Sequence, residues 1–599
     1  MISHNHNCHY TGSVLDSEFA AKSPESRLRT GIRLVRDLLK FHPRLFAIAV
    51  AGASLYSVCT VASSFGVSFL VDSVILPRFE TGQIDSGVYV TGAVIVIGIG
   101  LLRAFGVVVR RSFAGINNWR TVESLTMLLV RQIMTQPSIW HKKRMTGDLV
   151  ARVGVDSDAA AEVLGPLPFS TSVVLLVFLT GGWLIFVDTP LGLIAISVIP
   201  ILLMLNVGYQ RRIDKHYDTA QHELGALSSA VHESFDGVMV VKAFGAEDRE
   251  TRRLSLISTR LKDARVRAVS ARSTFEALLD GVPSLVNILL LVVGAMRVES
   301  ESMTIGELTS FIYLFTLLIF PLKIIGYVLS TVPHSASGYK RVREILDEPV
   351  VPNPASLISD APAGVGVVFE GVSFSFDKDS PKVLDSVSFR IAAGTTVVVV
   401  GATGSGKSTL LAVMAGLLQP SQGLVALAGK HASIVFQEPF LFSGSIEYNI
   451  CLGQKLSDEM MAEALYLSAS DSFVSELTNG TKTVIGERGI SLSGGQRQRI
   501  SLARAIAQGA DVLLLDDTTS SLDTVTESIV VDRLRGASRK VTTVVVASRP
   551  STIALADEVL FIEGGKLAEH GPHSALMSGN EKYRNLMQSF EHDRNEGDV

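Results

Sequence analysis

One stretch in the second half of the chain combines glycines, a lysine and hydroxyl side chains at a spacing that suits phosphate chemistry. A run of valines, 397–400, precedes it and apolar residues 410–414 follow, as expected for a strand, a loop and a helix. In the pattern G-x-x-x-x-G-K-[ST], backbone N–H groups surround a triphosphate at a helix N-terminus, Lys407 reaches the outer phosphates, and the Ser408 hydroxyl is placed for Mg²⁺. A chance glycine turn would not need that order of elements. The residues are Gly401, Ala402, Thr403, Gly404, Ser405, Gly406, Lys407, Ser408 and Thr409.

A second buried strand is predicted at 512–515, and it ends in Asp516. Beside a phosphate loop, this carboxylate would hold Mg²⁺ through water. Alternating apolar residues at Val367–Phe369 and Val372–Phe376 predict further strands. The sequence therefore predicts an α/β domain that binds ATP and Mg²⁺.

Composition indicates that this domain is only part of the molecule. A chain of 599 residues is too long for one core. With 47% hydrophobic and 19% charged residues and a mean hydropathy of +0.35, it is too apolar for a soluble protein and too charged for one wholly in lipid. A membrane half and a soluble half resolve the contradiction. The net charge of −4 gives no reason to expect nucleic acid as a partner.

The first half of the chain carries apolar stretches that favour about six membrane spans, some of which must extend past their flanking charges. Short, slightly acidic joints lie at one end of these spans, whereas basic residues such as Arg110, Arg111 and 141–144 flank the other end. The positive-inside rule then places both termini in the cytoplasm. Leu28–Leu39 is amphipathic and basic, which is typical of an interfacial helix. The charge-free stretches are Leu45–Val71, Ser86–Leu102, Val163–Val187, Thr189–Gln210, Gly281–Met296 and Leu308–Leu322.

Several polar features of this half leave two interpretations open. Thr146–Gly154 and Glu233–Glu247 are either ordinary amphipathic helices and turns or rigid segments that transmit motion. Charges within or near the spans either contact a substrate, or else snorkel toward the membrane surface or form structural pairs; they are Arg103, Glu276, Asp280 and Lys323. The polar N-terminal tail contains His4, His6, Cys8 and His9, but no second cluster completes a metal site.

The chain resembles an exporter-type half-transporter of the ATP-binding cassette (ABC) family, with one membrane domain fused to one nucleotide-binding domain. The resemblance covers nearly the whole chain after residue 28. Its most specific element is a family signature about ninety residues after the phosphate loop. Gln437, the segment Thr483–Gly489 and Asp523 also match family motifs. The signature reads Ser491, Leu492, Ser493, Gly494, Gly495 and Gln496.

This resemblance implies a six-helix all-α membrane domain followed by an α/β phosphate-loop cassette, and a dimer whose nucleotide domains close head to tail. Each ATP would lie between one subunit's phosphate loop and the other's signature, where Ser493 and the neighbouring amides suit a γ-phosphate. Gln437 would contribute to the Mg²⁺ site and Asp523 to the nucleotide interface. Phe376 stands where the family usually has a tyrosine stacked on adenine, and a phenyl ring stacks equally well.

Two positions depart from the family pattern. Asp517 stands where the family usually has a glutamate as catalytic base, and its carboxylate is one methylene shorter. Ser548 stands where the family has a histidine near the γ-phosphate. Both departures affect the ATP site built on this chain's own phosphate loop, whereas the signature of the chain is intact. The pattern favours a heterodimer in which this subunit holds ATP in a slow site, with a homodimer as the alternative.

The predicted function is ATP-driven export of a hydrophobic or amphipathic, small or lipid-like cargo, by a multi-pass protein of the cell inner (plasma) membrane. The alternative is a non-transporting regulator that binds ATP and gates a partner. The predicted organisation is a tail at 1–27, a transmembrane domain at 28–339, a linker at 340–365, a nucleotide-binding domain at 366–590 and a polar tail at 591–599.

Overall fold

The computed structural model divides the chain into two compact units, which we describe separately. A helical unit comprises the chain up to Ile133 and Gly147–Glu348, and a sheet unit comprises Met134–Thr146 and the chain from Pro349 onward. The predicted N-terminal tail, with its histidines, lies outside the described residues. These residues are 24–81, 86–351, 353–377, 380–486, 489, 491–518, 524–537, 541–547, 549, 552–553 and 556–597.

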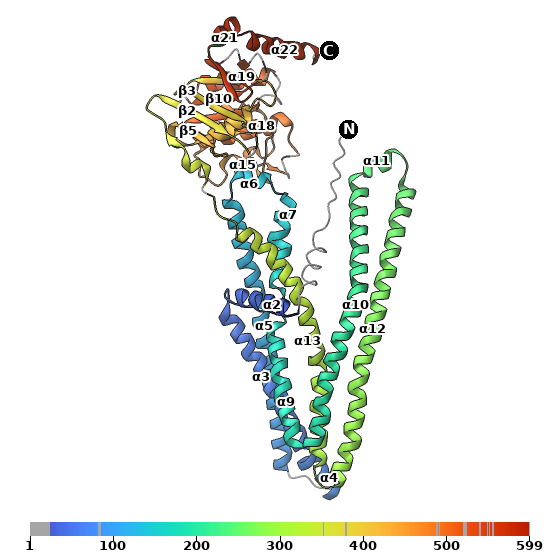
Figure 1. The fold of residues 1–599 in the computed structure, drawn as a ribbon. Coiled ribbons are helices and arrows are strands. Elements are labelled where there is room, and N and C mark those ends of the chain that lie inside the picture. The colour runs from blue at the N-terminus through green and yellow to red at the C-terminus, as the bar shows by residue number, and fades with distance from the viewer. Residues whose placement is uncertain are drawn as a thin grey trace. The chain divides into compact units, whose positions relative to one another are not determined.

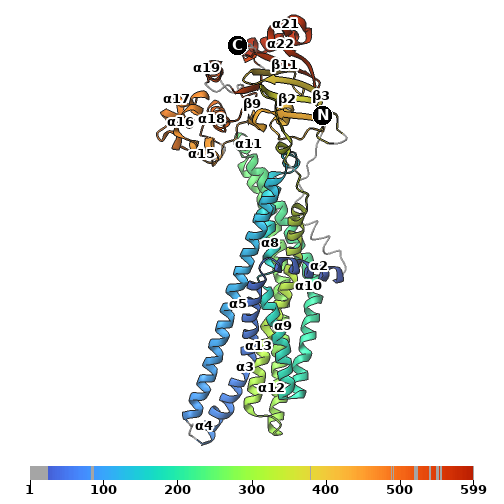
Figure 2. The ribbon, with the colours of Figure 1, turned by 90° about the vertical axis from the view of Figure 1, so that its left-hand side faces the viewer.

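Long helices make up the helical unit, and in Figures 1 and 2 they run roughly parallel to one another. Two of the longest helices, α10 and α12, lie side by side over much of their length. The elements are α2 (Pro24–Leu39), α3 (Pro43–Leu70), a π-helical turn η1 (Val71–Ile75), α4 (Leu76–Thr81), α5 (Ser86–Thr135), α7 (Thr146–Ala151), a second π-helical turn η2 (Arg152–Asp156), α8 (Ser157–Glu162), α9 (Leu167–Val187), α10 (Thr189–Asp236), α11 (Val238–Ala243), α12 (Glu247–Glu299) and α13 (Ile305–Leu346).

Among the described residues, four helical stretches are long and apolar enough to cross a membrane: 43–79, 87–135, 146–187 and 247–299. Two further apolar helical stretches, at 189–202 and 305–319, are shorter within the described residues. These stretches coincide with all six predicted spans, although the count of six stays a prediction. Helix α13 continues to Leu346, inside the segment predicted as linker.

Side chains at one end of this unit fix its turns. Asp188 accepts a hydrogen bond from the Leu191 amide at the start of α10, and its other oxygen forms an ion pair with Arg297 at 2.7 Å. Asp72 accepts hydrogen bonds from the Thr304 hydroxyl and the Gly306 amide at the start of α13. Each carboxylate therefore satisfies helix-terminal N–H groups that would otherwise lack partners.

The sheet unit contains one large sheet with the order β12-β11-β4-β10-β9-β6, a four-stranded sheet with the order β1-β5-β2-β3, and a two-stranded pair of β7 and β8. Within the large sheet the strands are parallel except β12. The strands are β1 (Ser359–Asp360), β2 (Val365–Phe374), β3 (Leu384–Ala392), β4 (Thr396–Val400), β5 (Gln422–Leu427), β6 (Ala432–Val435), β7 (Gly444–Ser445), β8 (Val484–Ile485), β9 (Val512–Asp516), β10 (Thr542–Val546), β11 (Glu558–Glu563) and β12 (Lys566–Gly571).

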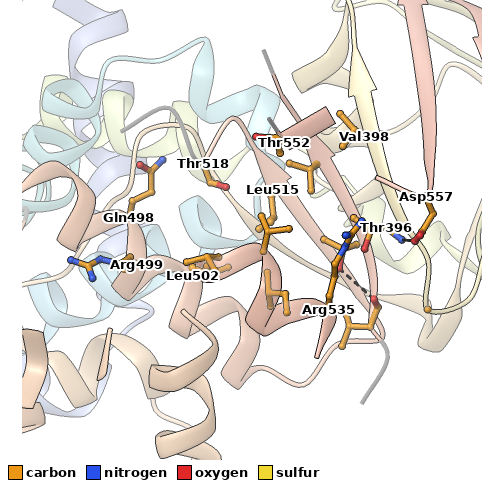
Figure 3. Close-up of a pocket in the computed structure, with 17 residues that line it drawn as sticks. Thr396, Val398, Gln498, Arg499, Leu502, Leu515, Thr518, Arg535, Thr552 and Asp557 are labelled. Carbon is orange, nitrogen blue, oxygen red and sulfur yellow. Dashed lines mark hydrogen bonds between the residues drawn. The ribbon is translucent and has the colours of Figure 1, made fainter. Parts of the chain in front are cut away.

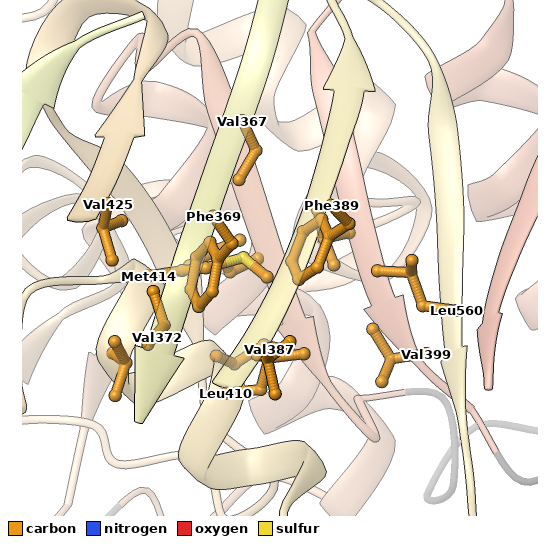
Figure 4. Close-up of a cluster of buried hydrophobic side chains, with 14 of the residues drawn as sticks. Val367, Phe369, Val372, Val387, Phe389, Val399, Leu410, Met414, Val425 and Leu560 are labelled. Carbon is orange, nitrogen blue, oxygen red and sulfur yellow. The ribbon is translucent and has the colours of Figure 1, made fainter. Parts of the chain in front are cut away.

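Helices cover both faces of the large sheet. Its central strands β4, β9 and β10 are therefore buried throughout their apolar runs. On one face, Leu410 and Met414 of α14 pack beneath the stacked rings of Phe369 and Phe389, whose centroids are 4.7 Å apart (Figure 4). On the other face lie α18 and α19. The helices are α14 (Lys407–Met414), α15 (Ile446–Cys451), α16 (Asp458–Leu467), α17 (Asp471–Glu476), α18 (Gly494–Ala507), α19 (Thr524–Arg535), α21 (His573–Gly579) and α22 (Glu581–Gly597).

The sheet unit also includes a short helix from the first half of the chain, α6 (Ser138–Lys142). Ile139 packs against the core beneath α14, and the Ser138 hydroxyl donates a hydrogen bond to the Leu417 carbonyl. Lys143 forms an ion pair with Asp377. The basic residues 141–144, interpreted from sequence only as flanking charge, therefore belong to a segment that packs on the sheet unit.

Candidate nucleotide site

The phosphate loop joins β4 to α14, and two of its glycines are required by the fold. A Cβ at Gly401 would lie 2.3 Å from the Ile562 carbonyl oxygen, so no larger residue fits. Gly406 adopts φ +103 directly before the helix begins at Lys407, a conformation that favours glycine. Gly404 also has a positive φ, and Thr409 lies in the first turn of α14. The loop therefore places its backbone amides at the N-terminus of a helix, which is the arrangement that a phosphate site requires.

Lys407 is folded back over the loop that carries it. Its Nζ donates hydrogen bonds to the carbonyl oxygens of Gly401 and Ala402 at 2.7 and 2.9 Å. Burial lowers the pKa of Lys407, and the nearby carboxylates of Asp517 and Asp516 partly oppose that shift. A phosphate would offer this ammonium group a stronger acceptor than a neutral carbonyl.

Ser408 and Asp516 meet at the carboxyl end of β9. The Ser408 hydroxyl donates a hydrogen bond to Asp516 Oδ1 at 2.9 Å. Burial raises the pKa of Asp516, while the Ser408 hydrogen bond and Lys407 lower it. A hydroxyl and a carboxylate are hard oxygen donors, and Mg²⁺ uses few protein ligands together with water and phosphate. The residues therefore fit Mg²⁺, although the described part of the chain contains no cluster of three or more His, Cys, Asp or Glu residues.

Asp517 and Gln437, which are eighty residues apart in the chain, also come together. Gln437 Nε2 donates a hydrogen bond to Asp517 Oδ2 at 3.3 Å. Burial and the neighbouring Asp516 raise the pKa of Asp517, while Arg549 and Lys407 lower it. Asp517 adopts φ +46, which is uncommon for a residue other than glycine.

Sequence reasoning assigned no role to two charged residues whose electrostatic interaction reaches Asp517, namely Arg549 and Glu527. Arg549 forms an ion pair at 2.8 Å with Glu527, whose side chain is 3% exposed, and Thr552 donates a hydrogen bond to the same carboxylate. Arg549 directly follows Ser548, so its position in the chain is the signal that could have found it. The predicted site residues Ser548 and Asp523 lie outside the described residues.

The signature residues begin α18. Ser493 accepts a hydrogen bond from the Gln496 amide, and the Gln496 side chain accepts one from the Ser493 amide, which forms a complete capping box. Gly494 and Gly495 form the first turn, where unpaired amides favour an anion. At the base of the same helix turn, Arg497 donates a hydrogen bond to the Leu492 carbonyl at 2.7 Å.

Phe376 presents a partly exposed ring after β2. The residue is 40% exposed, and its ring packs in an edge-to-face arrangement with that of Phe374, with centroids 5.1 Å apart. The ring of Phe376 is thus in contact with the core, while the residue stays partly exposed for stacking.

A separate cavity of about 370 Å³ lies on the opposite face of the sheet from α14 (Figure 3). Leu502 of α18, Leu515 of β9 and Val530 of α19 line it, together with the polar side chains of Gln498 and Thr518. The phosphate loop does not contribute to its lining. This cavity is therefore distinct from the phosphate-loop site.

A helical unit with membrane-length apolar helices, continuous with a phosphate-loop unit, defines an ATP-dependent membrane protein. Comparison with known proteins supports a narrower identification. Residues 46–322 match the ABC transporter transmembrane region, and residues 384–520 match the ABC transporter family.

Relatives with the same arrangement include an ATP-dependent lipid A-core flippase of Idiomarina loihiensis, 29% identical over 86% of this chain and 92% of that protein. A probable multidrug resistance ABC transporter ATP-binding/permease protein of Bacillus subtilis is 30% identical over 79% of this chain and 83% of that protein. A solved bacterial Atm1-family ABC exporter with ATP bound has a TM-score of 0.72 and 25% identity, over 91% of this chain and 98% of that one.

The chain belongs to the ABC transporter family, as an exporter-type half-transporter whose membrane region is fused to its ATPase. This confirms the predicted family, the helical and α/β fold classes, and ATP hydrolysis coupled to transport.

Proposed function

We propose that this chain is one half of a heterodimeric exporter, that its own ATP site hydrolyses slowly, and that it completes the partner's faster site with an intact signature. The observation that carries the proposal is Asp517, which follows Asp516 where a glutamate base is expected. Its carboxylate is one methylene shorter than that of glutamate, so it reaches less far toward an attacking water. Ser548 adds a second loss, because a hydroxyl cannot supply the charge of an imidazole.

The remaining residues favour ATP binding. Lys407 would exchange two carbonyl oxygens for the outer phosphates, and the amides of the loop would surround the phosphate chain. Ser408 and Asp516 would hold Mg²⁺, which when bound neutralises part of the charge on those phosphates. Gln437 would lie between the metal and Asp517 and so respond to both. A site of this kind binds ATP well and cleaves it slowly.

ATP would drive export through its preference for the closed dimer. Only a ligand that binds one conformation more tightly shifts the equilibrium between two conformations. ATP held by Lys407 in one subunit and by Ser493 in the other meets this condition, because the two contacts exist together only when the domains are closed. Hydrolysis at the partner's site then resets the transporter.

Cargo and location follow from the membrane half. The relatives named above are a lipid flippase and a multidrug transporter, which supports a hydrophobic or amphipathic cargo for this chain. Basic residues at one end of the spans and short acidic joints at the other support an inner-membrane protein with both termini in the cytoplasm.

The test compares the purified chain alone with the chain co-expressed with its partner. We expect slow ATP turnover alone, fast turnover with the partner, and ATP-dependent uptake of labelled lipid or drug into inside-out vesicles only with the partner. Rapid hydrolysis by the homodimer that Asp517→Ala abolishes would refute the slow-site proposal. A regulator that does not transport would show ATP turnover without uptake.

A further inference from the structure

Two arginines of α5 and one tyrosine of α3 form a basic cluster within the apolar helices. Helices α3 and α5 touch at Gly52 and Gly106, because a Cβ on Gly106 would lie 3.0 Å from both the Gly52 carbonyl oxygen and the Tyr56 amide. Arg103 and Arg110 lie one turn before and one turn after Gly106, on the same face of α5. The close crossing therefore brings Tyr56 between them.

Both guanidinium groups use the same aromatic ring. The Cζ atoms of Arg103 and Arg110 each lie 5.2 Å from the centroid of the Tyr56 ring. Arg110 also lies 4.4 Å from the centroid of Phe169, at the start of α9. Arg103 donates a long hydrogen bond, 3.5 Å, to the Tyr56 hydroxyl. Cation–π contacts hold the two side chains in place but leave their positive charge uncompensated.

Within the described part of the chain, neither Arg103 nor Arg110 forms an ion pair with a carboxylate, and one terminal nitrogen of Arg110 is buried without a hydrogen-bond partner. Arg110 is 8% exposed, so it does not reach water as a snorkelling arginine would. The adjacent Arg111, in contrast, is exposed and contacts no aromatic ring among the described residues. Two like charges close together in an apolar environment are costly unless an anion binds there.

The position of the cluster suits an amphiphile. At about 1.5 Å per helical residue, Arg103 and Arg110 lie roughly 25 and 36 Å along α5 from Ser86, near the far boundary of a hydrocarbon layer about 30 Å thick. Leu102 and Phe105 beside Arg103 are exposed in the single chain. An anionic headgroup at Arg103 would therefore leave an acyl chain or ring system against apolar surface.

We propose that Arg103, Tyr56 and Arg110 form a recognition site for the anionic group, a phosphate or carboxylate, of an amphipathic cargo. Arg103 and Tyr56 are only partly buried and would make the direct contacts, and the buried Arg110 adds positive charge at the same ring. This inference rests on the proposed export function and narrows its cargo to amphiphiles with negative charge.

The experiment measures ATPase stimulation of the full transporter, with its partner, in phosphatidylcholine nanodiscs. The probes are dodecyl phosphate, which is anionic, and dodecylphosphocholine, which has the same chain and a zwitterionic headgroup. We expect half-maximal stimulation at a lower concentration of dodecyl phosphate. Arg103→Gln would raise that concentration by about tenfold, as expected for loss of one charge-assisted hydrogen bond, and Arg103→Lys would raise it less.

Arg111→Gln is the matched control, because it removes an arginine from the same helix outside the cluster and would leave the dodecyl phosphate response unchanged. Equal responses of the wild type to both probes, or equal effects of Arg103→Gln and Arg111→Gln, would overturn the inference. Glycerol phosphate, a headgroup without a chain, distinguishes the sources of the anion: stimulation as strong as with dodecyl phosphate would show a soluble anion and refute the amphiphile. A wild type that moves no labelled amphiphile with ATP would instead refute the export proposal itself.

Discussion

The phosphate loop and the segment after β9 face the same nucleotide site, yet their residues suit its chemistry to different degrees. Around the loop, glycine conformations, Lys407 and the Ser408–Asp516 contact all match what a bound triphosphate and Mg²⁺ require. After β9, Asp517 and Ser548 stand where the resemblance to the family leads us to expect a glutamate and a histidine. In the proposed function, binding and cleavage of ATP depend on separate residues, so one can weaken while the other is kept.

The largest expected effect comes from removing the loop's cation. Lys407→Ala deletes a half-buried charge that would contact the outer phosphates, so the affinity for ATP would fall by at least about thirtyfold. Binding of a fluorescent ATP analogue measures it. Lys482→Ala, which removes an exposed lysine of the same unit, is the control and would change nothing. An unchanged affinity in Lys407→Ala would contradict the assignment of ATP binding to this loop.

Introducing the residues that are usual in the family would test the cleavage half of the comparison. Asp517→Glu combined with Ser548→His would raise ATP turnover by the purified chain about tenfold or more, because a positioned base and a charged imidazole both assist the reaction. ATP affinity would change little. Turnover is measured by phosphate release.

Asp517→Asn is the matched comparison for that variant, since it keeps the size of the side chain and removes its charge. Faster turnover in Asp517→Asn than in the wild type would contradict a role for this carboxylate as a weak base.

Acidic pH separates metal binding from phosphate binding. Burial raises the pKa of Asp516, so this carboxylate gains its proton at a higher pH than an ordinary aspartate. The proton competes with Mg²⁺. The affinity for Mg·ATP would therefore decrease as the pH falls through this raised pKa, while the affinity for ATP in a chelator would change less. Titration of nucleotide binding with and without Mg²⁺ measures the difference.

Asp516→Asn would abolish the difference between the two titrations, because an amide does not titrate. If the wild type loses affinity equally with and without Mg²⁺, another group is responsible.

The smallest effect concerns adenine. Phe376→Ala removes the partly exposed ring and would weaken ATP binding about fivefold, in line with roughly 1 kcal/mol for an aromatic contact. Phe376→Tyr would keep the affinity, because stacking needs only the ring face. Loss of binding in the tyrosine variant would show that the ring is enclosed by other groups when ATP binds.

Local sequence was sufficient to predict many of the helices and strands of this protein. The strands before the phosphate loop and before Asp516 were predicted within about one residue, because short buried runs of Val and Leu followed by a glycine or an acid have few alternatives. The amphipathic helix predicted at Leu28–Leu39 is present as α2, which begins at Pro24. Val367–Phe369 and the first part of Val372–Phe376 proved to be one strand, β2, which ends at Phe374, because register shifts around Gly371 let pairing continue through it.

Other features depend on residues far apart in the chain. Sequence interpretation gave Arg110 the same flanking role as Arg111, yet packing of α3 and α9 against α5 buries one and leaves the other exposed. The position of Ile139 also could not be read from local sequence, because this side chain packs against a core formed by residues more than two hundred positions later.

By itself, the sequence determined the phosphate loop, the acid that ends β9, the signature and the apolar helices, because each is specified by neighbours within a few turns of chain. Only the tertiary structure decided which arginines lose their water, which short helix joins the sheet unit, and that Gln437 meets Asp517 across eighty residues. Those outcomes depend on which side chains from distant segments exclude solvent together, and no local pattern encodes that.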